Sequence, residues 1–175
     1  VGADDVIFDR GSIEVKYALD QSAVTVTSLT ITQGYTGKIG LPNQNGSGTS
    51  AYQEYRDTYL KIGATTVTIG YGSGSGSGRI KIDTSTIQTT INVLNIGQAA
   101  ETGIPSLLWK GTHASNVLNV TKGSVGVAFF GGESATLATL RIGFVTNKAG
   151  DSEVRLGDGM SLTTVNMSGG IVVLQ

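Results

Sequence analysis

The sequence predicts an all-β protein that folds as a single-stranded, right-handed parallel β-helix. Three observations lead to this prediction: the composition, a short repeat of alternating apolar and polar residues that ends in glycine, and uneven spacing between the copies of that repeat. The 175 residues include 26 glycines and only two prolines. Abundant threonine, serine, valine and isoleucine favour strands joined by tight turns, so long helices are not expected.

The repeat consists of an apolar residue, a polar residue, a second apolar residue and a glycine. Side chains alternate between the two faces of a strand, so Leu60 and Ile62 point one way and Lys61 points the other. Each copy is therefore a short strand with one buried face, and the glycine after it lets the backbone turn. Such short strands need neighbours of the same kind, which stacked coils supply. The copies are Leu60–Gly63, Val67–Gly70, Leu94–Gly97, Leu140–Gly143 and Val154–Gly157.

The uneven spacing between the copies favours a β-helix over other repeat folds. Coils of a β-helix tolerate loops of different length, whereas the blades of a propeller have a fixed size. The alternative that stays open is a β-sandwich or jelly roll, in which longer strands are joined by tight hairpins. The sequence contains one Asn-Gly dipeptide of the hairpin type, Asn45-Gly46.

The chain has the length of one domain, and we expect residues 1–175 to form a single β-helix domain. Three segments depart from the repeat and are expected to be inserted loops, near 42–58, 71–78 and 97–105. The first is rich in asparagine, glycine and serine before it becomes aromatic and charged. The second alternates glycine with serine and is expected to protrude, and the third contains glycine and proline breakers.

Composition and charge argue against several classes of function. Charged residues make up 14% of the chain and the formal net charge is -1, so no basic surface for nucleic acid is expected. No apolar run approaches the ~20 residues that a membrane helix needs, so no membrane contact is expected. The absence of cysteine rules out disulfides and thiolate metal sites, and the sequence indicates neither a metal nor a cofactor.

Catalysis requires titratable groups in a suitable arrangement, and the sequence offers few. His113 is the single histidine, and without a recognisable orienting partner we interpret it as a surface or turn residue. Sugar hydrolysis needs two carboxylates ~5–9 Å apart. Adjacent Asp4 and Asp5 point to opposite faces of a strand, which makes them a poor pair. Glu54 and Asp57 lie in a loop, where a solvated charge cluster is favoured. We predict no catalytic residues and no enzymatic activity.

Asp151, Glu153 and Asp158 form the sequence cluster most similar to a calcium site. Calcium needs several oxygen ligands close together. These three residues surround or alternate with the strand Val154–Gly157. Carboxylates that face solvent from turns are therefore favoured over a metal site.

Aromatic residues are the candidate binding residues. Aromatic rings stack on the apolar face of sugar rings, which makes carbohydrate a candidate partner. The same side chains can instead cover the core or fill a subunit interface. The candidates are Trp109, Tyr52, Tyr55 and Tyr59, with Tyr71 as a further member of the set.

Several stretches carry a resemblance to a known group of proteins. They are Leu107–Thr112, Gly123–Ala128 and Leu162–Gly170, with similar stretches at Asp5–Asp9 and Leu29–Ile39. They resemble β-helical virion structural proteins of tailed bacteriophages, such as head decoration, fibre or spike components, and related bacterial β-helix proteins. The resemblance covers most of the chain, and its motifs are structural.

The resemblance implies a non-enzymatic structural protein of a phage particle, a capsid decoration, cement or fibre component that acts as a rigid rod. Its partners would be other virion subunits, such as the major capsid protein, and its location the virion. An uncapped β-helix end exposes unpaired strand edges, which favours docking or self-association, with a homotrimer as the expected state.

The alternatives are a carbohydrate-binding or polysaccharide-degrading β-helix module, similar to tailspikes or lyases, or a bacterial surface adhesin that is extracellular or on the cell surface. The same fold serves both roles, so the fold alone does not decide between them. The enzymes of this group carry clustered Asp, Arg and Lys on one strand face. This sequence lacks such a cluster.

Overall fold

A computed structural model of the chain describes residues 4–15, 20–143 and 152–175. Within these ranges the regular secondary structure consists of β-strands and one turn of 3-10 helix at Gly48–Ser50, which confirms the expected all-β class. The strands of the main sheet are β1 (Asp5–Phe8), β2 (Asp20–Thr32), β5 (Leu60–Tyr71), β6 (Ile80–Asp83), β7 (Thr90–Val93), β8 (Leu107–Lys110), β9 (Val117–Val120), β10 (Gly123–Val127), β11 (Ala135–Ile142), β12 (Ser152–Leu156), β13 (Met160–Met167) and β14 (Ile171–Leu174). A separate pair consists of β3 (Gln44–Asn45) and β4 (Tyr52–Gln53).

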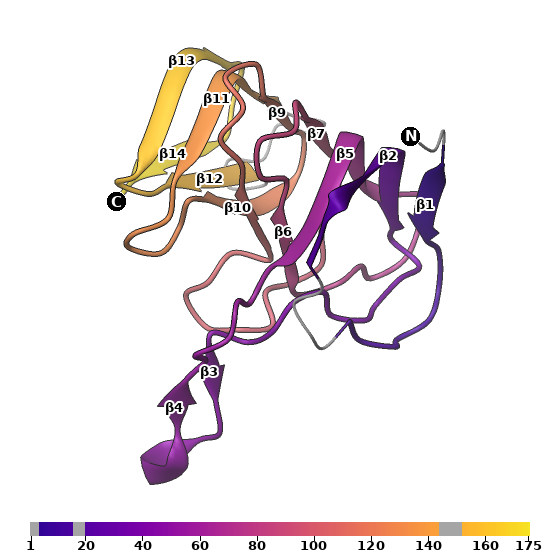
Figure 1. Ribbon diagram of the computed structural model, residues 1–175, viewed down its shortest axis with the longest axis vertical. Coiled ribbons are helices and arrows are strands. Elements are labelled where there is room, and N and C mark those ends of the chain that lie inside the picture. Colours follow the sequence, from indigo (N-terminus) through magenta and orange to yellow (C-terminus); the bar gives the residue numbers. More distant parts are fainter. Residues whose placement is uncertain (1–3, 16–19, 144–151) are drawn as a thin grey trace.

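The main sheet is parallel and curled. Its strand order is β13-β11-β9-β7-β5-β6-β8-β10-β12-β14, with β2 paired to β5 and β1 paired to β2 (Figure 1). The long strand β5 belongs to both halves of this order, because Leu60 and Lys61 pair with β6 whereas residues 66–69 pair with β7. Beyond β5 the chain therefore alternates between the two halves as it advances. Among the described strands, antiparallel pairing is limited to β3 and β4, which argues against the sandwich alternative.

Parallel pairing in register stacks like side chains into columns, and these columns form the core. One column crosses four strands in one half of the sheet and consists of Val67, Ile91, Leu118 and Leu140. A column in the other half consists of Ile82, Trp109, Val127 and Leu156. All eight side chains are buried and belong to the core. Burial of each large apolar side chain contributes about 1.5–3 kcal/mol, which is how such short strands become stable together.

The alternation expected from the repeat is confirmed in the strands that contain it. Leu60 and Ile62 are buried and Lys61 between them is partly exposed. Leu140 and Ile142 are also buried. Four copies of the repeat therefore mark the inward face of a strand. The prediction is wrong for Leu94–Gly97, which lies outside any strand directly after β7, with Leu94 40% exposed.

The glycine of the repeat has a different role from the one expected. β5 continues through Gly63, so the chain does not turn there. Gly70 does have a left-handed φ of 85°. A Cβ atom on Gly70 would overlap the carbonyl oxygen of Asn95. A Cβ atom on Gly157 would likewise overlap the carbonyl oxygen of Ala128. At these positions glycine lets neighbouring backbones approach closely, which corrects its interpretation as a simple turn residue.

The glycine-serine segment at 71–78 packs against other parts of the chain in its second half. Its first residues are exposed, whereas Ser77 is buried and its hydroxyl donates to the carbonyl of Gly37. Ala100, from the irregular segment that follows β7, donates its N–H to the carbonyl of Gly78, with a nitrogen to oxygen distance of 2.8 Å. The run of small residues therefore lets two connections lie side by side.

Candidate functional site

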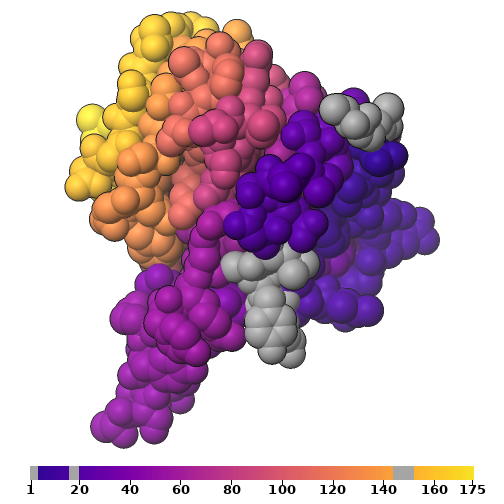
Figure 2. Space-filling view, viewed as in Figure 1, coloured from indigo at the N-terminus to yellow at the C-terminus, as the bar shows by residue number. Residues whose placement is uncertain are grey.

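Residues 42–58 form an arm that extends away from the curled sheet (Figures 1 and 2). Within the arm, the antiparallel strands β3 and β4 are connected through the 3-10 turn. The Asn45-Gly46 dipeptide lies at the start of this connection, where Gly46 adopts a φ of 76° that glycine tolerates without steric penalty. Tyr52 and Tyr55 are 53% and 84% exposed. Two of the four predicted binding aromatics are thus presented on a narrow projection.

Glu54 holds the arm together from within. Its carboxylate accepts hydrogen bonds from Asn45 Nδ2 at 2.6 Å and from the Arg56 guanidinium at 2.7 and 2.8 Å. The hydrogen bond from Arg56 is the main cause that lowers the pKa of Glu54 to about 2. Asp57 forms a separate ion pair with Lys61 at 2.9 Å. The two carboxylates considered for sugar hydrolysis are therefore each engaged with a different cation.

Glu101 joins the base of the arm to the sheet. Its Oε2 accepts the N–H of Asn43 at 3.0 Å, and its Oε1 lies 3.5 Å from Arg79 and 3.9 Å from Lys81. Lys81 is 1% exposed, and its ammonium lies 5.5 Å from the centre of the Phe130 ring. Burial lowers the pKa of Lys81 to about 8, against the opposing effect of the Glu101 carboxylate. Within the described ranges, neither Lys81 Nζ nor Glu101 Oε1 has a hydrogen-bond partner, so charge attraction holds these two groups.

Tyr59, expected as a surface aromatic, is buried at the foot of the arm with 2% of its surface exposed. Its hydroxyl donates to Glu133 Oε2 at 3.1 Å, and the Lys110 ammonium lies 4.3 Å from the centre of its ring. Burial, followed by the charge of Glu133, raises the pKa of Tyr59. Because the Tyr59 hydroxyl has a hydrogen-bond partner, burial of the side chain leaves no polar atom unsatisfied. Tyr59 therefore anchors the arm to the sheet and is not available to bind a ligand.

Trp109 is also buried, which corrects the expectation that it lies on the surface. It is 1% exposed and occupies the core column of β8. Its indole N–H donates to Thr84 Oγ1 at 3.1 Å, so the one polar atom of the side chain has a partner inside the protein. Trp109 therefore stabilises the core and does not present a face on which a sugar ring could stack.

The predicted catalytic alternatives occupy ordinary structural positions. His113 lies at a turn, where its Nδ1 accepts the N–H of Ser115 at 3.1 Å. Asp4 is exposed, and Asp5 accepts the hydroxyl of Ser28 at 2.6 Å across the β1–β2 pair. The side chains of His113 and Asp5 thus each take part in a local contact, within a turn and within a strand pair respectively.

The carboxylates considered for calcium binding are only partly within the described residues. Glu153 forms an ion pair with Arg155 on β12, and Asp158 is exposed. Asp151 lies outside the described residues. In the described part of the chain, no group of three or more His, Cys, Asp or Glu residues is placed to hold a metal ion.

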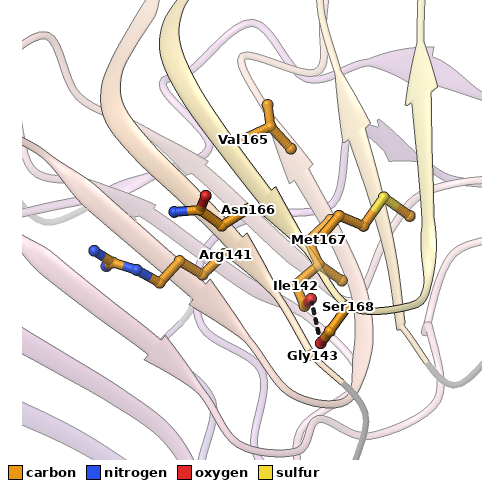
Figure 3. Close-up of a pocket in the computed structure, with 7 residues that line it drawn as sticks. All are labelled: Arg141, Ile142, Gly143, Val165, Asn166, Met167 and Ser168. Carbon is orange, nitrogen blue, oxygen red and sulfur yellow. Dashed lines mark hydrogen bonds between the residues drawn. The ribbon is translucent and has the colours of Figure 1, made fainter.

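The strand β13, last in the sheet order, provides a second exposed surface that the sequence did not reveal. Val165 and Met167 continue the columns of Leu140 and Ile142, yet they are exposed because only one side of β13 is paired. A hollow of about 480 Å³ lies beside them (Figure 3). Its lining consists of Arg141, Ile142, Gly143, Val165, Asn166, Met167 and Ser168. Alternation predicts which way a side chain points but not whether another strand covers it.

Comparison with known proteins identifies no relative: no family model, no curated protein and no solved structure matches this chain. In the ranges that the structure describes, no helix is long and apolar enough to cross a membrane. The functional interpretation therefore depends on the geometry of the arm and of the sheet surfaces.

Proposed function

We propose that this chain is a non-enzymatic structural protein of a virus particle, a decoration, cement or fibre component that binds other particle subunits such as a major capsid protein. The observation that carries the proposal is the arm, a narrow projection on which Tyr52 and Tyr55 are exposed. Exposed tyrosines on a fixed support are typical of contact residues in protein interfaces. The resemblance of the sequence to β-helical phage proteins supports the particle location.

We further propose that the curled sheet closes into a right-handed β-helix. The alternation of the chain between the two halves of the sheet and the continuous core columns support this architecture. The right hand is the one found in nearly all connections between parallel strands. A closed coil of this kind is stiff because stacked backbone hydrogen bonds run along its length, as a support for the arm requires.

Particle fractionation tests the proposed location. An antibody against the chain should detect it in purified particles of its source, and the isolated chain should rebind to particles that lack it. The double variant Tyr52→Ser and Tyr55→Ser should rebind at least about tenfold more weakly, since exposed interface tyrosines often dominate binding energy. Tyr71→Ser, an exposed tyrosine outside the arm, is the matched control and should rebind normally. A chain missing from purified particles would refute the proposal.

The second candidate is a carbohydrate-acting module or adhesin located outside the cell or on its surface. The exposure of Tyr52 and Tyr55 fits this candidate too, because tyrosine rings stack on sugars. If the arm degraded polysaccharide, Glu54 and Asp57 would be its nearest carboxylates. We expect no release of reducing ends from a polysaccharide panel. Release that Glu54→Gln or Asp57→Asn abolishes would replace the structural proposal with an enzymatic one.

A further inference from the structure

A hollow on the outer face of the sheet spans β1, β2 and β5. Strand pairing arranges its lining in two rows. The first row consists of Ile7, Thr30 and Thr68. The second consists of Asp9, directly beyond β1, with the paired residues Thr32 and Tyr71. The hollow has a volume of about 600 Å³, which is within the range of ~300–1,000 Å³ common for small-molecule sites.

The hollow combines apolar sides with a polar floor. Tyr71 on β5 is 64% exposed and Ile7 on β1 is 61% exposed, and β2 lies between these two strands. Adjacent strands are ~4.8 Å apart, so the two apolar groups are separated by the width of about two strand spacings. Thr30 and Thr32 on β2 supply hydroxyl groups between them.

One hydroxyl of this floor is unsatisfied within the protein. Thr32 Oγ1 is buried and has no hydrogen-bond partner among the described residues. Buried polar atoms are almost always hydrogen-bonded, so a water or a ligand hydroxyl that reaches this atom from the hollow would supply the partner that it lacks. The Asp9 carboxylate is also available, because its ion pair with Arg10 is exposed and spans 3.8 Å.

We propose that this hollow binds one ring of a neutral sugar chain. A pyranose ring has a C–H face that stacks on an aromatic ring, and its hydroxyl groups both donate and accept hydrogen bonds. Tyr71 supplies the aromatic face, Asp9 supplies an acceptor, and the threonines supply hydroxyl groups of matching character. The Asp9 carboxylate disfavours an anionic ligand. A wholly apolar ligand would bury the Asp9 and threonine oxygens without partners.

The structure thereby selects one residue from the aromatic set. Trp109 and Tyr59 are buried, and Tyr52 and Tyr55 belong to the arm. Tyr71 lies in a hollow with a carboxylate and several hydroxyl groups. The inference does not rest on the particle location, because sugar binding is measured on the purified chain alone.

The test titrates the full chain with hexaoses of glucose, mannose and galactose, by saturation-transfer NMR and calorimetry. At least one hexaose should bind to the wild type. The affinity for that hexaose should fall at least about tenfold in Tyr71→Ala, a loss of the size expected for one stacked ring. Tyr71→Phe keeps the ring and should stay within about threefold of the wild type. Tyr55→Ala removes a tyrosine on the arm that is more exposed than Tyr71, 84% against 64%, and should bind the hexaose as the wild type does.

The acceptor has its own variant, Asp9→Asn, which keeps the size of the side chain and removes its charge. This variant should weaken binding of the same hexaose at least about threefold, because a charged acceptor forms stronger hydrogen bonds than an amide. The proposal is overturned if no hexaose binds at about 10 mM. It is equally overturned if Tyr71→Ala has no greater effect than Tyr55→Ala, or if a polyuronate oligomer titrated in the same way binds more tightly than every neutral hexaose.

Discussion

Leu156 and Leu174 provide a matched test of the core columns, because the same residue type occupies neighbouring positions of one column. Leu156 on β12 pairs with Leu174 on β14. Leu156 is 5% exposed, whereas Leu174 is 79% exposed. Leu156→Ala removes buried methyl groups and leaves a cavity, so the free energy of unfolding should fall by about 2–5 kcal/mol. Leu174→Ala removes groups that are already in water and should change it by about 0.5 kcal/mol or less.

Urea unfolding followed by circular dichroism measures both variants against the wild type. In a chain of this length, each 1 kcal/mol lowers the melting temperature by about 2–4 °C, so Leu156→Ala should melt about 4–20 °C lower. The slope of the urea dependence should stay constant, since neither variant changes how much surface unfolding exposes. Equal losses in the two variants, or a loss below about 1 kcal/mol for Leu156→Ala, would refute the assignment of this column to the core.

Three further predictions concern charged contacts within the arm and at its base. The pKa of Lys81 is lowered to about 8 in the folded state, so the charged Lys81 side chain lowers the free energy of unfolding. This destabilisation is complete below about pH 8 and disappears as the pH rises toward 10.5. Urea unfolding should therefore show the stability of Lys81→Met relative to wild type falling by about 3 kcal/mol between about pH 7 and 10.5, and a constant difference would contradict this. Because the pKa of Glu54 is lowered to about 2, the contribution of its carboxylate to the free energy of unfolding is present above pH 4.5 and is lost as the pH falls through 2. An NMR titration of Glu54 should find its midpoint at that pH, and Arg56→Ala should raise the midpoint. Tyr59→Phe should lower the free energy of unfolding by about 1.5–3 kcal/mol through loss of the bond to Glu133, and an unchanged urea midpoint would contradict its anchoring role.

Much of the sheet could be predicted because its signal is local. Alternation within a few residues is enough to show that Leu60 and Ile62 share one face and that Lys61 takes the other. The parallel pairing followed from the number and shortness of such segments. The role of Gly157 could not be predicted, because the carbonyl oxygen that its missing Cβ avoids belongs to Ala128, on another turn of the chain.

The candidate sites were less predictable because they depend on contacts between distant segments. Asn43 meets Glu101 across 58 residues of sequence, and Tyr59 meets Glu133 across 74. Composition marked the aromatic residues, but only the fold shows that Trp109 is in the core and that other rings are exposed. The exposure of Tyr71 beside Asp9 likewise follows from strand pairing, which no local pattern encodes.

The shared register of the columns restricts how this protein can change in length. Removing or adding one residue inside β9 would exchange its buried and exposed faces against β7 and β11, so Leu118 would face water. Removing or adding one complete circuit of the chain would keep every remaining side chain above its counterpart. Related proteins would therefore be expected to differ in length by whole circuits and in their connections, while the strands themselves stay free of insertions.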